Sequence, residues 1–162
     1  MGLFNFFRKK DNNTNKSETS KDDQQNKFIS DMTKSAEFFV RSSSENFKGL
    51  DYSVKSLEVV ENILEEASGF YTEMNNEQQQ NIITSVGSYI FEVARQNFGG
   101  KYFWYDKLNQ PILVTGQPNF EASIIANDKV EKRLVNGVED NIPFYFIGYV
   151  QLVNNKKSGM IV

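Results

Sequence analysis

The sequence predicts an α+β fold in which N-terminal helices pack on a small antiparallel sheet of two or three strands and two further helices follow. Before residue 99, apolar residues recur at helical spacing in three segments. After the Gly99-Gly100 pair, aromatic and β-branched residues fill short runs that turns separate. With 162 residues, of which 39% are hydrophobic, the chain can bury the core of one domain.

Two helices are predicted in the first part of the folded chain. Apolar residues at helical spacing begin at Phe28, and a serine cluster followed by Gly49 marks the end of the first helix. The second helix has Ser53 as its N-cap, carries an apolar stripe and ends at Gly69.

The third helix, over residues 77–98, carries a broad apolar band and is expected at the centre of the fold. The following Gly99-Gly100 pair supplies the left-handed backbone that ends a helix. Gly87 lies inside the helix, where glycine is about 1 kcal/mol less favourable than alanine. We therefore expect another helix to pack closely there.

Strands and two short helices are predicted for the rest of the chain. Residues 101–105 and 111–115 form a hairpin, and residues 119–124 add a third strand. A short helix ends at Gly137. A last helix, rich in aromatic residues, begins at a cap formed by Asp140 or Asn141.

The composition divides the chain into four parts. Residues 1–10 are apolar and then basic, and residues 11–27 contain no apolar side chain. A segment without apolar residues cannot offset its ordering entropy by burial, so residues 11–27 are predicted to be a disordered linker. Residues 28–155 are the predicted α+β domain, and residues 156–162 are expected to be a tail.

The N-terminal segment is a candidate membrane contact. Its apolar residues would insert among lipids while the basic residues meet anionic headgroups. The candidate residues are Leu3, Phe4, Phe6, Phe7, Arg8, Lys9 and Lys10. The alternative is a frayed terminus, or one whose apolar residues pack against the domain.

The sequence lacks the residues that are characteristic of several classes of function. The chain has neither cysteine nor histidine, which argues against a metal site, a cofactor or a catalytic triad. A net charge of −3 argues against nucleic acid as a partner. No apolar run approaches the ~20 residues of a transmembrane helix. We expect a cytoplasmic protein, located at the inner face of the membrane if its N-terminus docks there.

Three short motifs resemble a small bacterial domain family of unknown function. They are Gly87-x-Tyr89-x-x-Glu92, Gly99-Gly100-Lys-Tyr-Phe-Trp104 and Lys132-Arg133-x-x-x-Gly137, the last preceding an aromatic helix. The resemblance spans roughly residues 53–150 and implies an order of elements, since the family has no established activity. The chain departs from the family at Phe91, where Gly is more common and where the larger side chain would crowd a close approach.

Four residues are candidate ligand-binding positions: Glu92, Trp104, Lys132 and Arg133. A carboxylate on a central helix suits a ligand anchor or a general base. Alternatively, Glu92 lies on the polar edge of that helix and pairs with Arg95 or Gln96. Trp104 is predicted either to be covered by a helix or to form a contact patch.

The Lys132-Arg133 pair can form an anion site, or it simply complements the C-terminal dipole of a short helix. The acidic residues Glu58, Glu61 and Glu65 are most simply a solvated helix face.

These observations favour a non-enzymatic protein-interaction module whose partner is another protein. An immunity-type or accessory role in a bacterial system suits a small acidic α+β domain by analogy. The alternative is a small-ligand binder or a weak carboxylate-dependent hydrolase that uses Glu92. Motifs of phosphate-binding loops and nucleophile elbows do not occur in the sequence.

Overall fold

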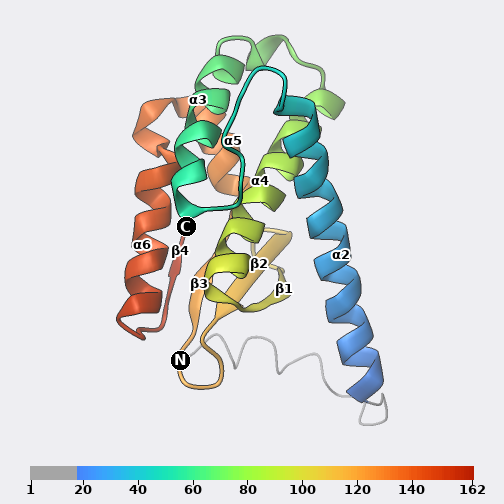
Figure 1. Ribbon diagram of the computed structural model, residues 1–162, viewed down its shortest axis with the longest axis vertical. Coiled ribbons are helices and arrows are strands. Elements are labelled where there is room, and N and C mark those ends of the chain that lie inside the picture. Colours follow the sequence, from blue (N-terminus) through green and yellow to red (C-terminus); the bar gives the residue numbers. More distant parts are fainter. Residues whose placement is uncertain (1–17) are drawn as a thin grey trace.

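The computed structural model describes residues 18–162, in which helices are followed by a sheet and then by further helices (Figure 1). The α-helices are α2 (Glu18–Ser43), α3 (Leu57–Ser68), α4 (Asn76–Phe98), α5 (Asn127–Asn136) and α6 (Ile142–Asn154). The strands are β1 (Lys101–Tyr105), β2 (Gln110–Thr115), β3 (Ala122–Ile124) and β4 (Gly159–Ile161). Short 3₁₀ turns occupy η2 (Val54–Ser56), η3 (Tyr71–Glu73) and η4 (Val138–Asp140). The predicted α+β class is confirmed.

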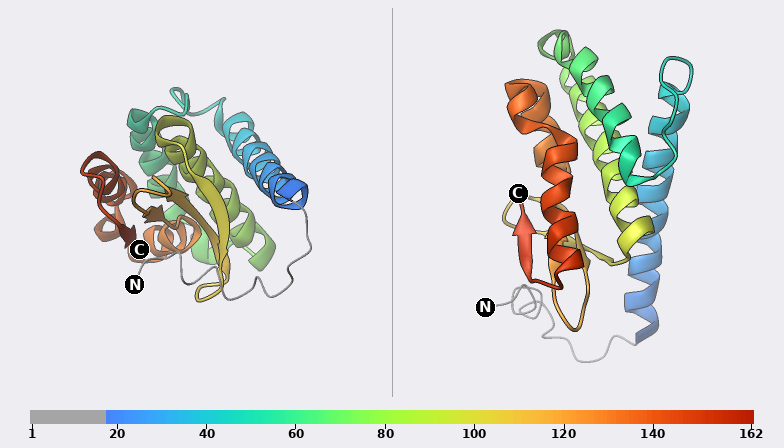
Figure 2. Two further views of the ribbon diagram at one scale, coloured as in Figure 1. Left: turned by 90° about the horizontal axis from the view of Figure 1, so that it is seen from below. Right: turned by 60° about the vertical axis from the view of Figure 1, so that its left-hand side comes forward.

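Within the described residues the sheet has four strands, in the order β1-β2-β3-β4. The hairpin β1-β2 and the pair β2-β3 are antiparallel, as predicted, but β4 pairs in parallel with β3. The expected tail at residues 156–162 is therefore wrong, because it contains β4. β4 lies beside α6 (Figure 2). The N–H of Gly159 donates to the carbonyl of Glu121, and the side chain of Ile161 packs on Gly148 of α6.

The first helix begins ten residues earlier than the expected Phe28, so the predicted disordered linker is wrong for residues 18–27. A contact with the sheet provides the physical reason. The side-chain amide of Gln25 donates to the carbonyl of Tyr102 at 2.8 Å and accepts from its N–H at 2.7 Å. Lysine, glutamine and glutamate also favour helix, so a polar segment extends a helix whose apolar part is already packed.

The central helix α4 agrees closely with its prediction. Asn75 and Gln78 form a capping box at its start, and Gly99 ends it with φ of +74°. Gly87 faces Asn127 at the start of α5, and a Cβ on Gly87 would lie 2.0 Å from the Asn127 Oδ1 atom. The close helix packing expected at Gly87 is therefore present.

The predicted caps of the other helices are also found. The Ser53 hydroxyl accepts from the N–H of Ser56 and starts η2, which leads directly into α3. Of the two proposed caps for the last helix, Asn141 is the one used: its side chain accepts from the N–H of Phe144. None of the helices in residues 18–162 has the length and apolar character that a membrane crossing requires.

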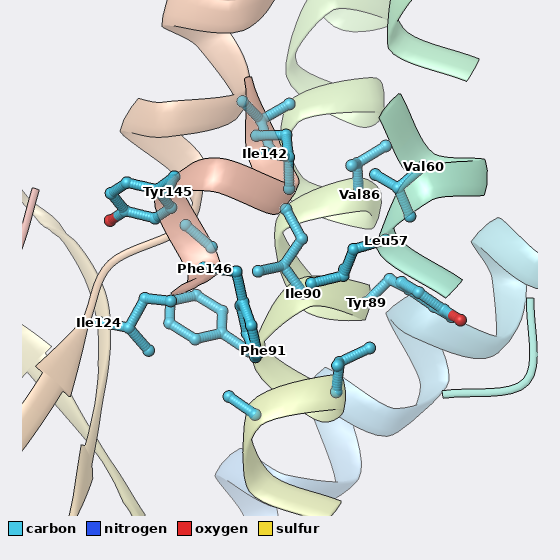
Figure 3. Packing of buried hydrophobic residues seen from close by; sticks show 14 of the residues in the cluster. Leu57, Val60, Val86, Tyr89, Ile90, Phe91, Ile124, Ile142, Tyr145 and Phe146 are labelled. Atoms are coloured by element: carbon cyan, nitrogen blue, oxygen red, sulfur yellow. The ribbon is translucent and has the colours of Figure 1, made fainter. Parts of the chain in front are cut away.

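The main hydrophobic core lies between the helices and one face of the sheet (Figure 3). Tyr102, Leu113 and Ile124 contribute the sheet side of this core, and Phe91 is fully buried in it. The opposite face of the sheet carries a separate apolar group, here called the second-face cluster. It comprises Phe103, Tyr105, Ile112, Val114, Ile125 and Met160.

Candidate functional site

The four candidate residues lie in two separate regions. Glu92 on α4 and Trp104 on β1 belong to the same region, since Tyr102 bonds to Glu92 and is two residues from Trp104 on the same strand face. Lys132 and Arg133 both lie on α5. Glu92 and Trp104 are thus linked only through Tyr102, and the other pair lies elsewhere.

Glu92 is the centre of a hydrogen-bonded group that joins α2, α4 and β1, here called the Glu92 cluster. Its Oε1 atom accepts from Thr33 Oγ1 at 2.9 Å and from Arg95 Nη2 at 2.8 Å. Its Oε2 atom accepts from Arg95 Nε at 2.6 Å and from the Tyr102 hydroxyl at 2.8 Å. Four donors saturate a carboxylate, and Glu92 is 0% exposed.

The surroundings keep Glu92 ionised. Burial alone raises the pKa of Glu92, but hydrogen bonds from Arg95, Tyr102 and Thr33 outweigh burial and hold that pKa below its usual value. Burial raises the pKa of the Tyr102 phenol, so this hydroxyl keeps its proton and donates a hydrogen bond to the ionised carboxylate.

These contacts give Glu92 a role in holding three elements together. A general base must reach a substrate proton, whereas both oxygens of Glu92 are engaged and closed to solvent. The expected pairing with Arg95 is present. The expected position of Glu92 on a polar edge of the helix is wrong, because the residue is buried beneath α2 and β1.

Trp104 borders an open groove between α2, α4 and the hairpin, here called the Trp104 groove. The groove has a volume of about 550 Å³, and the side chain of Trp104 is 46% exposed. Apolar atoms of Phe28, Met32 and Pro111 line it beside the indole. Its polar lining residues are Gln24, Lys27, Asp31 and Ser88. Trp104 is therefore exposed, as a contact patch requires, and its role as a contact stays a prediction.

Arg133 is buried, contrary to both predictions for it. Its side chain is 1% exposed and pairs with Glu61 and Glu65 on α3. The second oxygen of Glu61 accepts from the N–H of Ile142 at the start of α6, so this group, here called the Arg133 cluster, joins α3, α5 and α6. The guanidinium is thus occupied by carboxylates of the chain itself.

The burial of Arg133 also changes the predictions for the acidic residues of α3 and for Lys132. Glu61 is largely buried, so the acidic residues of α3 are not one solvated face. Lys132 is half exposed and pairs with Asp128 at 2.8 Å on its own helix. Consecutive helical residues point in different directions, and the Lys132-Arg133 pair therefore does not form one anion site.

Sequence reasoning missed Gln25 and Thr33, the two polar contacts from α2. Gln25 lies in the segment predicted to be disordered, and no local pattern distinguishes it from its polar neighbours. Tyr102 was open to prediction, because strand alternation places it on the same face as Trp104. Among residues 18–162, no group of three or more acidic, cysteine or histidine residues is placed to hold a metal ion.

Comparison with known proteins found no match. No family model matches the chain, and neither a curated protein nor a solved structure matches it. The resemblance to a bacterial domain family therefore stays a prediction.

Proposed function

We propose that the protein is a non-enzymatic protein-interaction module and that the Trp104 groove receives an apolar side chain of a partner protein. One observation carries the proposal. The charged candidates Glu92 and Arg133 are engaged inside the fold, whereas the large aromatic candidate faces an open groove.

The composition of the groove favours a protein partner. Tryptophan is over-represented among the residues that dominate binding energy, especially where an apolar pocket surrounds it. Phe28, Met32 and Pro111 provide such surroundings. Lys27 and Asp31, which pair at 3.0 Å on the exposed surface of α2, supply the polar rim that is typical of protein interfaces.

The alternative is a small ligand in the same groove. A volume of about 550 Å³ lies within the range of small-molecule sites. Glu92 does not line this groove, so such a ligand would be held by the apolar walls and the rim. This form of the alternative needs no hydrolytic role for Glu92.

The decisive experiment is affinity capture from the source organism with three full-length chains. These are the wild type, Trp104→Ser and Phe144→Ser, the last altering an aromatic residue that is 78% exposed on α6. We expect one captured protein to be lost with Trp104→Ser and retained with Phe144→Ser. The purified partner should then bind Trp104→Ser at least about 30-fold more weakly, as expected for a central aromatic contact.

The opposite pattern, loss with Phe144→Ser alone, would assign the interface to α6. Trp104 is the chain's single tryptophan, so its fluorescence reports directly on the groove. A metabolite that shifts both this emission and the melting temperature of the wild type, and neither property of Trp104→Ser, would favour the small-ligand alternative.

An immunity-type or accessory role predicts that the captured protein is a toxin or a secretion component encoded by a neighbouring gene. Membrane contact by residues 1–10 and a cytoplasmic location are further predictions. Residues 1–10 lie outside the described part of the chain.

A further inference from the structure

We propose that the outer face of α6 is a contact between two copies of this chain, which pack with their α6 helices antiparallel about a two-fold axis. This face carries Phe144, Ile147 and Gln151, which follow one another at helical spacing. Figure 1 shows α6 on the side of the molecule opposite to α2, which borders the Trp104 groove. The contact therefore goes beyond the proposed function and leaves the groove open in both copies.

The composition of α6 is the first argument for a partner on this face. None of its 13 residues is charged. A surface helix of a globular protein carries charged and polar residues on its outer face, whereas a helix that is apolar all round is buried. Phe144 is 78% exposed and Ile147 is 49% exposed, so no element of residues 18–162 covers this face. A second molecule that covers it would complete the burial that such a helix requires.

The charges at the two ends of α6 select a second copy of the chain as that molecule. Glu139 lies just before the helix, and Lys156 and Lys157 lie just after it. All three side chains are exposed, and none of them forms an ion pair within residues 18–162. An antiparallel arrangement places the acidic end of each helix beside the basic end of the other. An anionic membrane surface would attract only the basic end.

The length of the helix is consistent with this pairing. A helix of 13 residues is about 20 Å long, and a two-fold axis near its middle, at Ile147, exchanges the two ends. Ile147 then packs on the same residue of the other copy, and Phe144 lies against Gln151 of the other copy. Every contact in such a dimer occurs twice. Glu139 of each copy therefore lies near Lys156 of the other, one pair at each end.

Sedimentation velocity of the full chain over a range of concentrations tests the contact. One helix from each copy makes a small interface, so we expect dimerisation with a Kd on the order of 10 µM. Phe144→Ser should weaken the dimer at least about 30-fold. The matched control is Phe38→Ser, which alters a phenylalanine that is 56% exposed on α2 and should dimerise like the wild type. Both side chains are exposed, and unchanged melting temperatures verify that the two variants stay folded.

Charge reversal tests the antiparallel arrangement itself. Glu139→Lys places like charges at both ends of the dimer, and a Lys156→Glu/Lys157→Glu chain does the same. Each variant alone should dimerise about fivefold more weakly than the wild type at low salt. A mixture of the two variants has opposite charges at both ends, because each altered end meets the complementary end of the other variant. With a fluorescent label on one variant, sedimentation should show a heterodimer about as stable as the wild-type dimer.

Four results would overturn the proposal. Dimerisation that Phe38→Ser abolishes and Phe144→Ser does not would place the contact on α2. Mixed charge-reversed chains that associate no better than each alone would exclude the antiparallel arrangement. Growth beyond twice the chain mass would indicate open-ended association. A wild type that stays monomeric far above the expected Kd would exclude a second copy. In that case, binding to phosphatidylglycerol vesicles that Phe144→Ser abolishes would assign the face to a membrane, and a captured protein lost with Phe144→Ser would assign it to a different protein.

Discussion

The Glu92 cluster and the Arg133 cluster each bury one charged group between three elements. The buried charge is negative in the first cluster and positive in the second, and only in the first are all hydrogen-bonding positions of the buried group filled. In the first, the anion is fully buried, and its cation Arg95 is 26% exposed. In the second, the cation is buried, while Glu65 is 63% exposed. All four hydrogen-bonding positions of Glu92 are filled, whereas Arg133 Nη1 has no partner within residues 18–162.

This difference matters because an ion pair that stays intact in the interior adds little net stability, whereas removal of one partner leaves an uncompensated charge. The Glu92 carboxylate cannot return to water when its partner is removed. Glu65 can, because it already faces solvent, and the largely buried Glu61 keeps the N–H of Ile142 as a donor. We therefore expect the Glu92 cluster to be the more sensitive of the two.

Removal of the Arg95 charge should have the largest effect. Arg95→Met leaves the buried carboxylate with neutral donors only, and we expect a loss of about 3 kcal/mol in the free energy of unfolding at pH 7. Urea denaturation measures this loss. A Glu92→Met/Arg95→Met double variant, which removes both charges and keeps apolar volume, should lose less than the single variant. A larger loss in the double variant would contradict this account of the cluster.

The Tyr102 hydroxyl should contribute the next largest effect. Tyr102→Phe removes one donor to an ionised acceptor, and we expect a loss of about 2 kcal/mol. Tyr149→Phe is a matched control, since its buried hydroxyl bonds to the neutral hydroxyl of Thr115 at 2.6 Å. Hydrogen bonds between neutral groups are about half as strong, so the control should lose about 1 kcal/mol. Equal losses in urea denaturation would show that the charge of Glu92 has no influence.

The Arg133 cluster should tolerate replacement of its cation. Arg133→Met keeps the volume of the buried side chain and removes an unpaired Nη1 atom, while Glu61 still accepts from the N–H of Ile142. We expect a loss of only about 1 kcal/mol by urea denaturation. If Arg133→Met loses as much as Arg95→Met, the completeness of the hydrogen bonds does not distinguish the two clusters.

Acid titration should give the smallest but most specific difference. The pKa of Glu92 is lower in the folded protein than its usual value of 4.5, so its stabilisation is complete above that pH. It is lost as the pH falls through the lower, folded-state pKa. Glu92→Gln should therefore flatten the acid limb of a stability curve by up to about 1.4 kcal/mol per pH unit. Parallel acid limbs in wild type and variant would contradict the lowered pKa.

Much of the fold was predictable because local signals mark it. The capping box at Asn75, the glycine pair after Phe98 and the Asn141 cap each depend on residues within four positions. The start of α2 and the strand β4 were missed for the opposite reason. Gln25 meets Tyr102 across 77 positions of sequence, and β4 forms only because β3 is already in place.

In the candidate site, too, the contacts that were missed join residues far apart in the sequence. Glu92 and Trp104 were identified by residue type, but their burial and exposure were not, because strand and helix faces are assigned only when the partner elements are known. Arg133 was interpreted as a surface charge, since its partners Glu61 and Glu65 lie 72 and 68 positions away. A buried ion pair of this kind has no signature in a single sequence.

The contact between Gln25 and Tyr102 also affects how the protein behaves at high concentration. β1 is an edge strand, and unpaired backbone groups along such an edge invite association with strands of other molecules. Gln25 fills one N–H and one C=O of that edge with its side-chain amide, as a neighbouring strand would. The N-terminal turns of α2 therefore occupy part of the β1 edge and oppose edge-to-edge aggregation of the sheet.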